Sequence, residues 1–192
     1  MKFFYTCLAV LGALFSGCRS NSTGDIPAVA PFEPDKFCGN WYEIARLPNF
    51  FEKGLSGVTA FYAPIPGSPY IRVINRGVSS RGEIKSISGR ARFAGNEGTG
   101  ELEVSFFYPF YSKYRVIYLD EAYRTAIVCG GTRNYLWILA RKPTLSEAEL
   151  QPLIAFIRDA GFDVGKLEFS AIKNGGSASD AAAAVEAVSA DQ

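Results

Sequence analysis

Gly39-Asn40-Trp41-Tyr42-Glu43-Ile44-Ala45-Arg46-Leu47 is a stretch whose side chains alternate between the two faces of an expected strand. Much later, the apolar stretch Tyr135-Leu136-Trp137-Ile138-Leu139-Ala140 ends in Arg141. A guanidinium packs flat on an indole, and a glycine lets the backbone pass close beneath a sheet. The two stretches predict a β-barrel in which Trp41 and Arg141 stack across the closed end. Trp41, Glu43 and Ala45 are then expected to face inward together.

The segment between Pro34 and Phe169 repeats a strand pattern that restarts after short turns rich in Gly, Pro and Ser. Such spacing is typical of a meander or barrel. An all-β fold is therefore expected, with about eight antiparallel strands in an up-and-down barrel just wide enough for one small ligand. The predicted strands are 40–48, 56–63, 70–78, 84–94, 100–107, 113–119, 123–130 and 135–141.

After Pro143 the pattern becomes helical. Ser146 is a plausible N-cap with Glu149 three residues later, and Gly161 is expected to end the helix. The apolar face of this helix needs an apolar surface, and the last barrel strand offers one because it is apolar on both sides. We predict a C-terminal helix packed outside the barrel, followed by a short strand at 164–169.

The composition excludes several classes of protein. The 192 residues carry a formal net charge of +1, so no long-range field favours nucleic acid. Histidine is absent, which removes Ser-His-Asp and Cys-His catalysis and His-ligated zinc or haem. We expect no metal, no cofactor and no enzymatic activity.

The N-terminus is typical of an exported protein. Residues 1–17 have the charged start and short apolar core of a signal peptide, and Phe15-Ser16-Gly17-Cys18 resembles the bacterial lipobox, in which the cysteine is diacylated. An ordinary signal peptide with a spare cysteine is the alternative. We expect a lipidated tether over 18–33, a barrel domain over 34–173 and a disordered tail over 174–192.

Five segments, in order, make the chain similar to the lipocalin family, and within it to the bacterial and apolipoprotein D-like branch. The segments are 39–46, 73–77, 104–111, 119–124 and 135–141. The resemblance assigns structural roles to Gly39, Trp41, Asp120, Tyr123 and Arg141. The family's usual Thr-Asp-Tyr motif is replaced here by Leu119-Asp120-Glu121-Ala122-Tyr123, which has a different spacing.

The resemblance implies a membrane-anchored protein that binds fatty acids or lysophospholipids for storage, transport or repair of envelope lipid. It also implies the outer membrane, since Arg19 is not the Asp that retains lipoproteins in the inner membrane, with the barrel facing the periplasm. A monomer or homodimer is expected. The alternative function is a protein-interaction module with a filled barrel and an aromatic docking rim.

Strand alternation and loop order give candidate ligand-binding residues. Large aromatics either fill the barrel or form the wall of an apolar cavity. Loop cations are either solvated or attract an acidic head group. The cavity candidates are Glu43, Phe61, Phe93, Leu102, Val104, Phe106, Tyr114, Tyr135 and Trp137. The mouth candidates are Phe51, Lys53, Arg81, Phe110, Lys113 and Arg133.

Two cysteines fall within the predicted barrel domain. Cys129 is placed near the open end and Cys38 just before Trp41 at the closed end. A disulfide between them is geometrically unfavourable, so both are expected to be thiols. No neighbour in the sequence would lower the pKa of Cys129, so a nucleophilic role is not expected.

Overall fold

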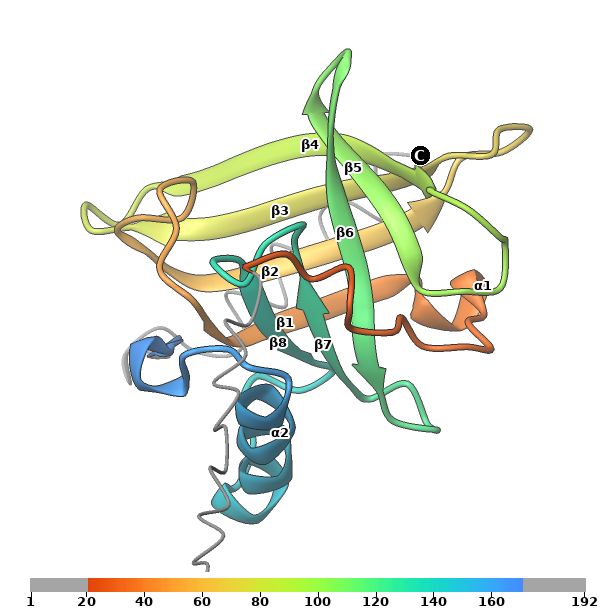
Figure 1. Ribbon diagram of the computed structural model, residues 1–192. Helices are drawn as coiled ribbons and strands as arrows, with labels where there is room; N and C mark the ends of the chain where they lie inside the picture. The colour runs from red at the N-terminus through yellow and green to blue at the C-terminus, as the bar shows by residue number, and fades with distance from the viewer. Residues whose placement is uncertain (1–20, 171–192) are drawn as a thin grey trace, which may run out of the picture.

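The computed structural model describes residues 21–170 and shows a closed antiparallel barrel with one helix outside it (Figure 1). Eight strands run up and down, and β1 pairs with both β8 and β2 to close the sheet. The strands are β1 (Gly39–Arg46), β2 (Leu55–Pro64), β3 (Ile71–Ser79), β4 (Ile84–Phe93), β5 (Glu101–Phe107), β6 (Phe110–Leu119), β7 (Thr125–Cys129) and β8 (Leu136–Ala140). The predicted fold class is confirmed. β6 begins three residues earlier than predicted because its hairpin with β5 turns at Tyr108–Pro109.

β1 carries an irregularity that changes which side chains enter the barrel. Glu43 pairs with Leu139, whereas Ala45 pairs with Ile138 and Arg46 with Trp137. At this β-bulge, two residues of β1 lie opposite one residue of β8. The inward and outward order of the side chains is therefore reversed after the bulge. The expectation that Ala45 faces inward is therefore wrong. Ala45 packs in the outer core, and Arg46 is brought to the inner face.

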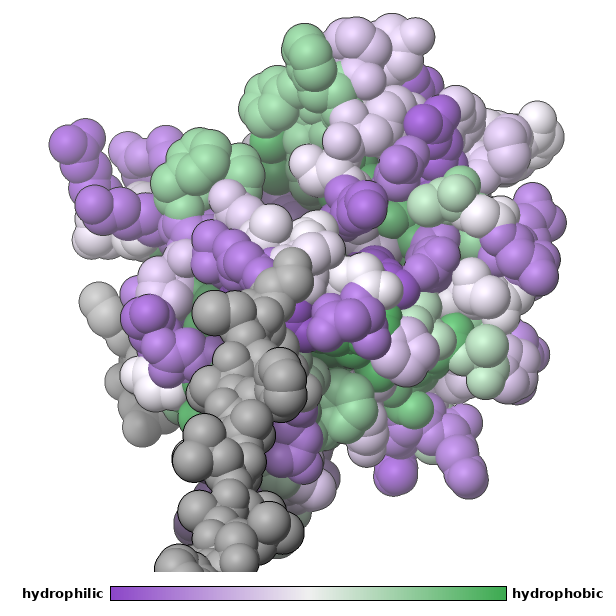
Figure 2. Space-filling model, viewed as in Figure 1, coloured by the Kyte–Doolittle hydropathy of each residue, from purple (hydrophilic) through white to green (hydrophobic). Residues whose placement is uncertain are grey.

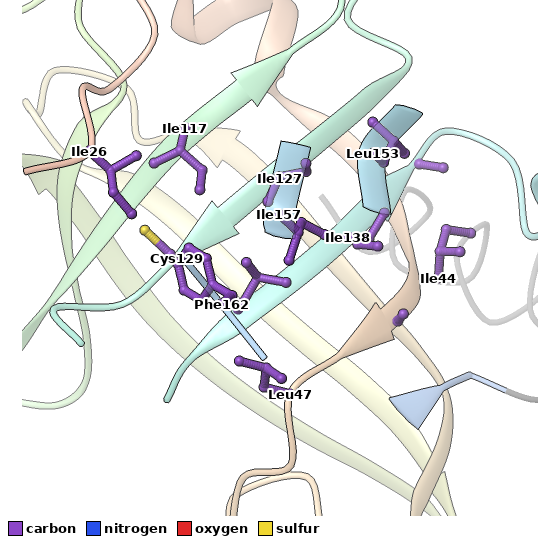
Figure 3. Packing of buried hydrophobic residues seen from close by; sticks show 13 residues of the cluster. Ile26, Ile44, Leu47, Ile117, Ile127, Cys129, Ile138, Leu153, Ile157 and Phe162 are labelled. Atoms are coloured by element: carbon purple, nitrogen blue, oxygen red, sulfur yellow. The ribbon is translucent and has the colours of Figure 1, made fainter. Parts of the chain in front are cut away.

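The helix α2 (Glu147–Asp159) covers the outer face of β7 and β8, as predicted. Ser146 and Glu149 form the expected capping box. Leu153 and Ile157 are buried against Ile127 and Ile138, and this outer core is drawn in Figure 3. In residues 21–170, no helix is long and apolar enough to span a membrane.

The segment after α2 only partly matches its prediction. A short 3₁₀ turn, η1 (Val164–Lys166), comes first, because Asp163 accepts a hydrogen bond from the Gly165 amide. The strand β9 (Glu168–Phe169) then pairs with Ala45 and Arg46 on β1. β9 therefore occupies the edge of β1 beyond Tyr42, where β2 no longer pairs with it.

The segment 21–33 lies along the barrel wall, which corrects the expected tether. Thr23 and Ile26 are buried beside β6 and β7. The Val29 amide donates to Val116 at 2.9 Å, and the Phe32 amide donates to Gly98 at 2.8 Å. Three hydrophobic residues of this segment, Ile26, Val29 and Phe32, gain apolar contacts that a free tether would not have.

The closed end is built around Arg141. Its guanidinium lies 3.8 Å from the centre of the Trp41 ring, as predicted. The same group donates hydrogen bonds to five backbone carbonyl oxygens, those of Lys36, Phe37, Cys38, Asn40 and Tyr123. The first two of these belong to the short helix α1 (Pro34–Phe37).

Three further motif residues complete the closed end. Gly39 has a φ of +96°, and a Cβ there would lie 3.3 Å from Arg141 Nη1. Asp120 accepts from the Arg124 and Thr125 amides in the β6–β7 turn, which lowers the pKa of its carboxyl despite partial burial. The Tyr123 hydroxyl accepts from the Glu33 amide at 3.0 Å, so this turn also holds the incoming N-terminal segment.

We expect Trp41→Ala to lower the free energy of unfolding by about 3–5 kcal/mol, because it empties a packed site. Arg141→Ala is also expected to destabilise the fold, and the double mutant should lose less than the sum of the two. Arg141→Lys should recover little, since one ammonium cannot reach five carbonyls. Urea unfolding measures all four variants. Arg124→Ala, at an exposed ion pair, is the control and should change stability by less than about 0.5 kcal/mol. Additive losses would mean that the stacking carries no energy.

Candidate ligand-binding cavity and its mouth

The lower half of the barrel encloses a small apolar pocket. The enclosed cavity is about 10 Å³, which is room for about one water molecule. The lining includes Leu102, Val104 and Tyr114, which the sequence predicted. The other lining residues are Phe37, Tyr62, Ile71, Val73 and Ala91. Almost every surface facing this cavity is carbon, so its chemistry suits a hydrocarbon chain, but a chain would enter only if the lining side chains moved apart.

Two tyrosines of the pocket lining meet across the interior. Tyr62 on β2 and Tyr114 on β6 share a hydrogen bond of 2.7 Å between their hydroxyl oxygens. Burial raises the pKa of Tyr62 to about 12 and that of Tyr114 above its usual range, so both stay protonated. One hydroxyl hydrogen is engaged between the two oxygens, and the other remains available as a donor.

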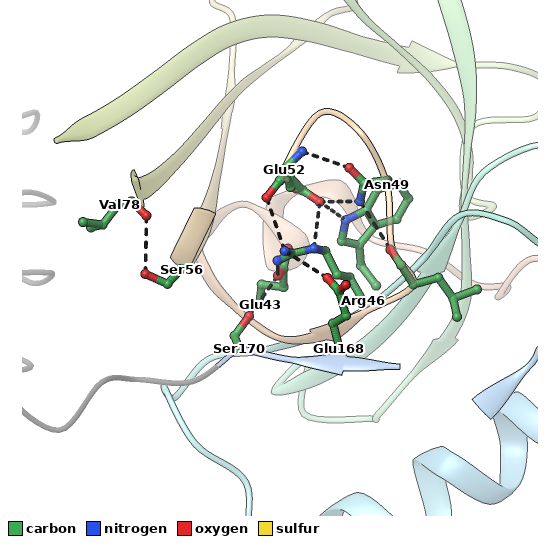
Figure 4. Close-up of polar contacts among 10 residues, drawn as sticks. Glu43, Arg46, Asn49, Glu52, Ser56, Val78, Glu168 and Ser170 are labelled. Atoms are coloured by element: carbon green, nitrogen blue, oxygen red, sulfur yellow. Dashed lines mark hydrogen bonds and ion pairs between the residues drawn. The ribbon is translucent and has the colours of Figure 1, made fainter. Parts of the chain in front are cut away.

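Above the tyrosines, the wall formed by β1 and β8 carries a buried charged cluster (Figure 4). Arg46 lies at its centre, and its side chain is 7% exposed. Its guanidinium contacts Glu43 at 2.6 Å and Glu168 at 3.3 Å. Arg46 Nε has no hydrogen-bond partner and lies 3.9 Å from the Glu52 carboxylate. The guanidinium therefore faces three carboxylates.

Glu52 reaches into this cluster from the β1–β2 loop. Its carboxylate accepts from Trp137 Nε1 at 2.9 Å and from Asn49 Nδ2 at 2.7 Å. Its backbone carbonyl accepts from Arg46 at 3.3 Å. The same loop places Phe51 6.2 Å from Tyr135, which in turn stacks on Trp137. Glu52 therefore fixes the loop over one side of the mouth.

Glu43 is the most strongly perturbed acid of the cluster. Burial raises its pKa to about 7, and the neighbouring Glu52 adds to the rise. Arg46 and the Ser170 hydroxyl oppose it, the latter through a hydrogen bond of 2.9 Å. The cluster therefore carries more negative than positive charge near neutral pH.

The opposite wall of the mouth is open. Ile84 to Ser88 on β4 are all exposed, although alternate side chains point inward. Ile87 pairs with Asn75 and lies on the inner face, yet it is 38% exposed. A filled barrel would bury these inward residues. The upper barrel is therefore a cup that opens above the apolar pocket.

The remaining cavity candidates lie at different heights. Phe106 lies against Gly89, where a Cβ would come within 2.7 Å of its ring. Phe93 packs on Phe32 at the closed end, with ring centres 6.4 Å apart, below the pocket. Phe61 lies on the outer face, because Gly39 pairs with Tyr62 and Trp41 with Ala60. The prediction for Phe61 is wrong by one position in register, and Tyr62 is the aromatic that enters the barrel.

The four predicted mouth cations do not gather. Lys53 and Arg81 are exposed on two rim loops. Lys113 lies within β6 and alternates with the inward Tyr114, so it lies on the outer face beside Gly131. Arg133 is buried, and binds Asp25 at 2.7 Å and the Ala160 carbonyl at 3.1 Å. It joins the N-terminal segment to the end of α2, so its placement at the mouth is wrong.

The rim carries the predicted aromatics. Phe51 and Phe110 are 60% and 78% exposed. Figure 2 shows apolar surface gathered at the tip of the β5–β6 hairpin, at the top of the view. Arg46, Glu52 and Tyr62 are the site residues that sequence reasoning missed. Strict alternation along β1 predicts that Arg46 faces outward, so the sequence pattern offered no reason to include it. Tyr62 could have been found, because it is the neighbour of the predicted Phe61 in the same strand.

Both cysteines of the described part are thiols, as predicted. Burial raises the pKa of Cys129 to about 11 and also raises that of Cys38. Such thiols are poor nucleophiles near neutral pH. Cys18, the signal peptide and the tail beyond Ser170 lie outside the described residues.

We expect Glu43→Gln to change how stability depends on pH. The pKa of Glu43 rises from 4.5 to about 7 on folding, so its contribution is present below about pH 4.5 and is lost as pH rises through 7. The stability difference between Glu43→Gln and the wild type should therefore grow across this window in favour of the glutamine. Urea unfolding at pH 4.5 to 8 measures it.

Glu149→Gln is the matched control for this titration. The pKa of Glu149 is held at about 2 by hydrogen bonds from Lys142 and Ser146, so its substitution should shift stability by a constant amount across the window. A flat difference for Glu43→Gln as well would show that Glu43 stays ionised beside Arg46.

Residues 32–171 match the family described as Lipocalin-like domain. The outer membrane lipoprotein Blc of Citrobacter freundii is 45% identical over 143 residues, which cover 74% of this chain and 80% of that protein. The outer membrane lipoprotein Blc of Vibrio cholerae serotype O1 is 41% identical over 162 residues, which cover 83% of this chain and 94% of that protein.

Among solved structures, insecticyanin from the tobacco hornworm Manduca sexta aligns with a TM-score of 0.64. It is 20% identical, and the alignment covers 78% of this chain and 86% of that one, so it shows the fold alone. The family match spans most of the chain, and the relatives exceed two fifths identity. The chain belongs to the lipocalin family, the β-barrel proteins that bind small hydrophobic ligands.

Proposed function

We propose that this lipocalin carries a single-chain lipid, a fatty acid or a lysophospholipid, for storage, transport or repair of envelope lipid. The observation that carries this function is the open cup above an apolar pocket. The inward face of β4 is exposed near the mouth, and the pocket below is lined by carbon. A lipid tail in the pocket removes apolar surface from water, and its head group remains in the cup.

The charged cluster favours a lysophospholipid with an amine in its head group over a free fatty acid. Glu43, Glu52 and Glu168 surround a single guanidinium, so another carboxylate would meet repulsion. An ammonium would instead be attracted by the Glu52 carboxylate, which the β1–β2 loop supplies. The phosphate of the same head group would lie toward Lys53 and Arg81 on the rim.

The alternative is an interaction module with a filled barrel, and the small volume of the lower cavity suits it. A filled barrel predicts buried inward residues along β4, and Ile87 is 38% exposed. The aromatic rim does not separate the two functions, because it suits a protein partner as well as a lipid.

We also propose that Cys18 is acylated and anchors the protein in the outer membrane, facing the periplasm. Two relatives are named outer membrane lipoproteins. The sequence Phe15-Ser16-Gly17-Cys18 supports the same chemistry here. Acyl chains contribute about 0.8 kcal/mol per buried methylene, so two or three of them hold a protein on a bilayer almost permanently.

We expect lysophospholipids to change Trp137 fluorescence saturably, because this indole lies in the mouth and donates a hydrogen bond to the Glu52 carboxylate, which an ammonium would approach. Affinity should rise with tail length from about eight carbons, by up to about fourfold per methylene, until the tail outgrows the pocket. Trp137→Phe is the control, and should leave only the insensitive signal of buried Trp41. Equal affinity for short and long tails would contradict binding by apolar partition.

We expect an amine-bearing lysophospholipid to bind more tightly than a fatty acid of equal length, by roughly tenfold at most. Glu52→Gln should narrow this preference and keep the fold, because glutamine still accepts from Trp137. Glu83→Gln is the matched control, since Glu83 is an exposed rim carboxylate paired with Lys85 at 2.7 Å. Dissociation constants of both ligands for the three proteins provide the test. If the ratio of the two dissociation constants is the same in Glu52→Gln as in the wild type, Glu52 does not select the head group.

A further inference from the structure

The two ends of the barrel differ sharply in their exposed apolar surface. The loops β1–β2, β3–β4, β5–β6 and β7–β8 meet at the open end, because the strands alternate in direction. Within residues 21–170, every exposed large hydrophobic side chain lies at this end, on these loops, on adjoining strand residues or on β9, and none lies on the closed-end loops. They are Phe50, Phe51, Val78, Ile84, Ile87, Phe107, Tyr108, Phe110 and Phe169.

The most exposed of these residues form two projections. Phe107, Tyr108 and Phe110 are 69%, 72% and 78% exposed on the β5–β6 hairpin, which stands out at the top of Figures 1 and 2. Phe50 is 75% exposed and stacks on Phe51, with ring centres 3.9 Å apart. Surface of this kind in water is costly and marks a contact with a partner or a membrane. Aromatic side chains are also enriched at the interface between lipid and water.

The charges of the rim fit an anionic or zwitterionic lipid surface. Lys53 and Arg81 are exposed on the first two loops, and Glu83, the exposed carboxylate beside Arg81, is paired with Lys85 at the start of β4. Glu52 points into the barrel, and its side chain is 13% exposed. The outward side of these loops is therefore net positive, and lipid phosphates attract such a surface.

The start of the described chain lies at the same end. The Arg133 amide donates to the Asn21 carbonyl at 2.8 Å, and Ser22 pairs with Thr132. Both partners belong to the β7–β8 loop, whose Tyr135 lies 6.2 Å from Phe51. Cys18 precedes Asn21 by three residues, and three residues span at most about 11 Å. An acyl group on Cys18 is therefore confined to the neighbourhood of the mouth.

We propose that the open end of the barrel lies on the bilayer that holds the anchor, with the β5–β6 tip and the β1–β2 loop in the head-group region. The proposal rests on acylation of Cys18, which is part of the proposed function. In this orientation a lipid passes between bilayer and cavity along the aromatic rim, without crossing water. The anchor, the apolar projections and the cations then act on one surface.

The test uses the full-length lipidated protein in vesicles of phosphatidylethanolamine and phosphatidylglycerol. Single cysteines replace exposed residues at the rim, in Tyr108→Cys and Phe110→Cys, and at the closed end, in Glu97→Cys and Glu121→Cys. An environment-sensitive thiol probe is attached at neutral pH. Cys38 and Cys129 react slowly there, because burial raises the pKa of each. Lipids with brominated acyl chains then quench probes that reach the bilayer.

The rim probes should be quenched by brominated lipid and shielded from iodide in solution, and the closed-end probes should show the reverse. Equal quenching at both ends, or stronger quenching at Glu97→Cys and Glu121→Cys, would overturn the orientation. Circular dichroism and lysophospholipid binding confirm that each labelled protein is folded.

Anchoring is measured separately, by radioactive palmitate incorporation and vesicle flotation of the wild type and Cys18→Ser. If the wild type incorporates no palmitate and does not float, the anchor itself fails and the orientation fails with it. If the wild type is labelled and floats but the closed-end probes are quenched, the anchor stands and the orientation alone is wrong.

Discussion

The guanidinium of Arg141 is the interaction on which the barrel depends. It donates hydrogen bonds to five backbone carbonyl oxygens and stacks on Trp41. One side chain therefore holds α1, the start of β1 and the β6–β7 turn together. Buried carbonyls that lose their donor are costly, and a planar group with five donors matches several at once. Because this end is closed, the pocket above it can stay apolar. Gly39 permits the close approach, since a side chain there would meet Arg141 and strain the backbone.

The bulge in β1 gives this barrel its polar wall. One additional residue between Glu43 and Ala45 turns Ala45 toward α2 and Arg46 toward the interior. The same site therefore joins the outer core to the inner charged cluster. Glu52 and Glu168 reach Arg46 from a loop and from β9, so three separate segments supply the charges. Burial of this cluster raises the pKa of Glu43, and the carboxylate of Glu52 adds to the rise.

The closed end and the open end of the barrel have different roles. The closed end keeps water from the lower pocket, and the open end has exposed apolar projections and a mouth lined on one side by charge. The N-terminal segment connects the two, since it starts beside Thr132 and reaches Gly98 at Phe32. The proposed binding and the proposed docking therefore use the same end, as a carrier that exchanges ligand with a membrane would require.

The sequence by itself determined the strand order, the outer helix and the Trp41–Arg141 contact. These depend on alternation, capping and turn chemistry, which are local, and on one pair of motifs. It also placed Leu102, Val104 and Tyr114 inside, because β5 and β6 alternate regularly there. Only the tertiary structure decided that Phe61 faces outward, that Arg46 faces inward and that Arg133 binds Asp25. The physical reason is that the side-chain period of a strand is two. A shift of one residue, through a bulge or a register set by a distant partner, therefore exchanges the faces without leaving a mark on the local pattern.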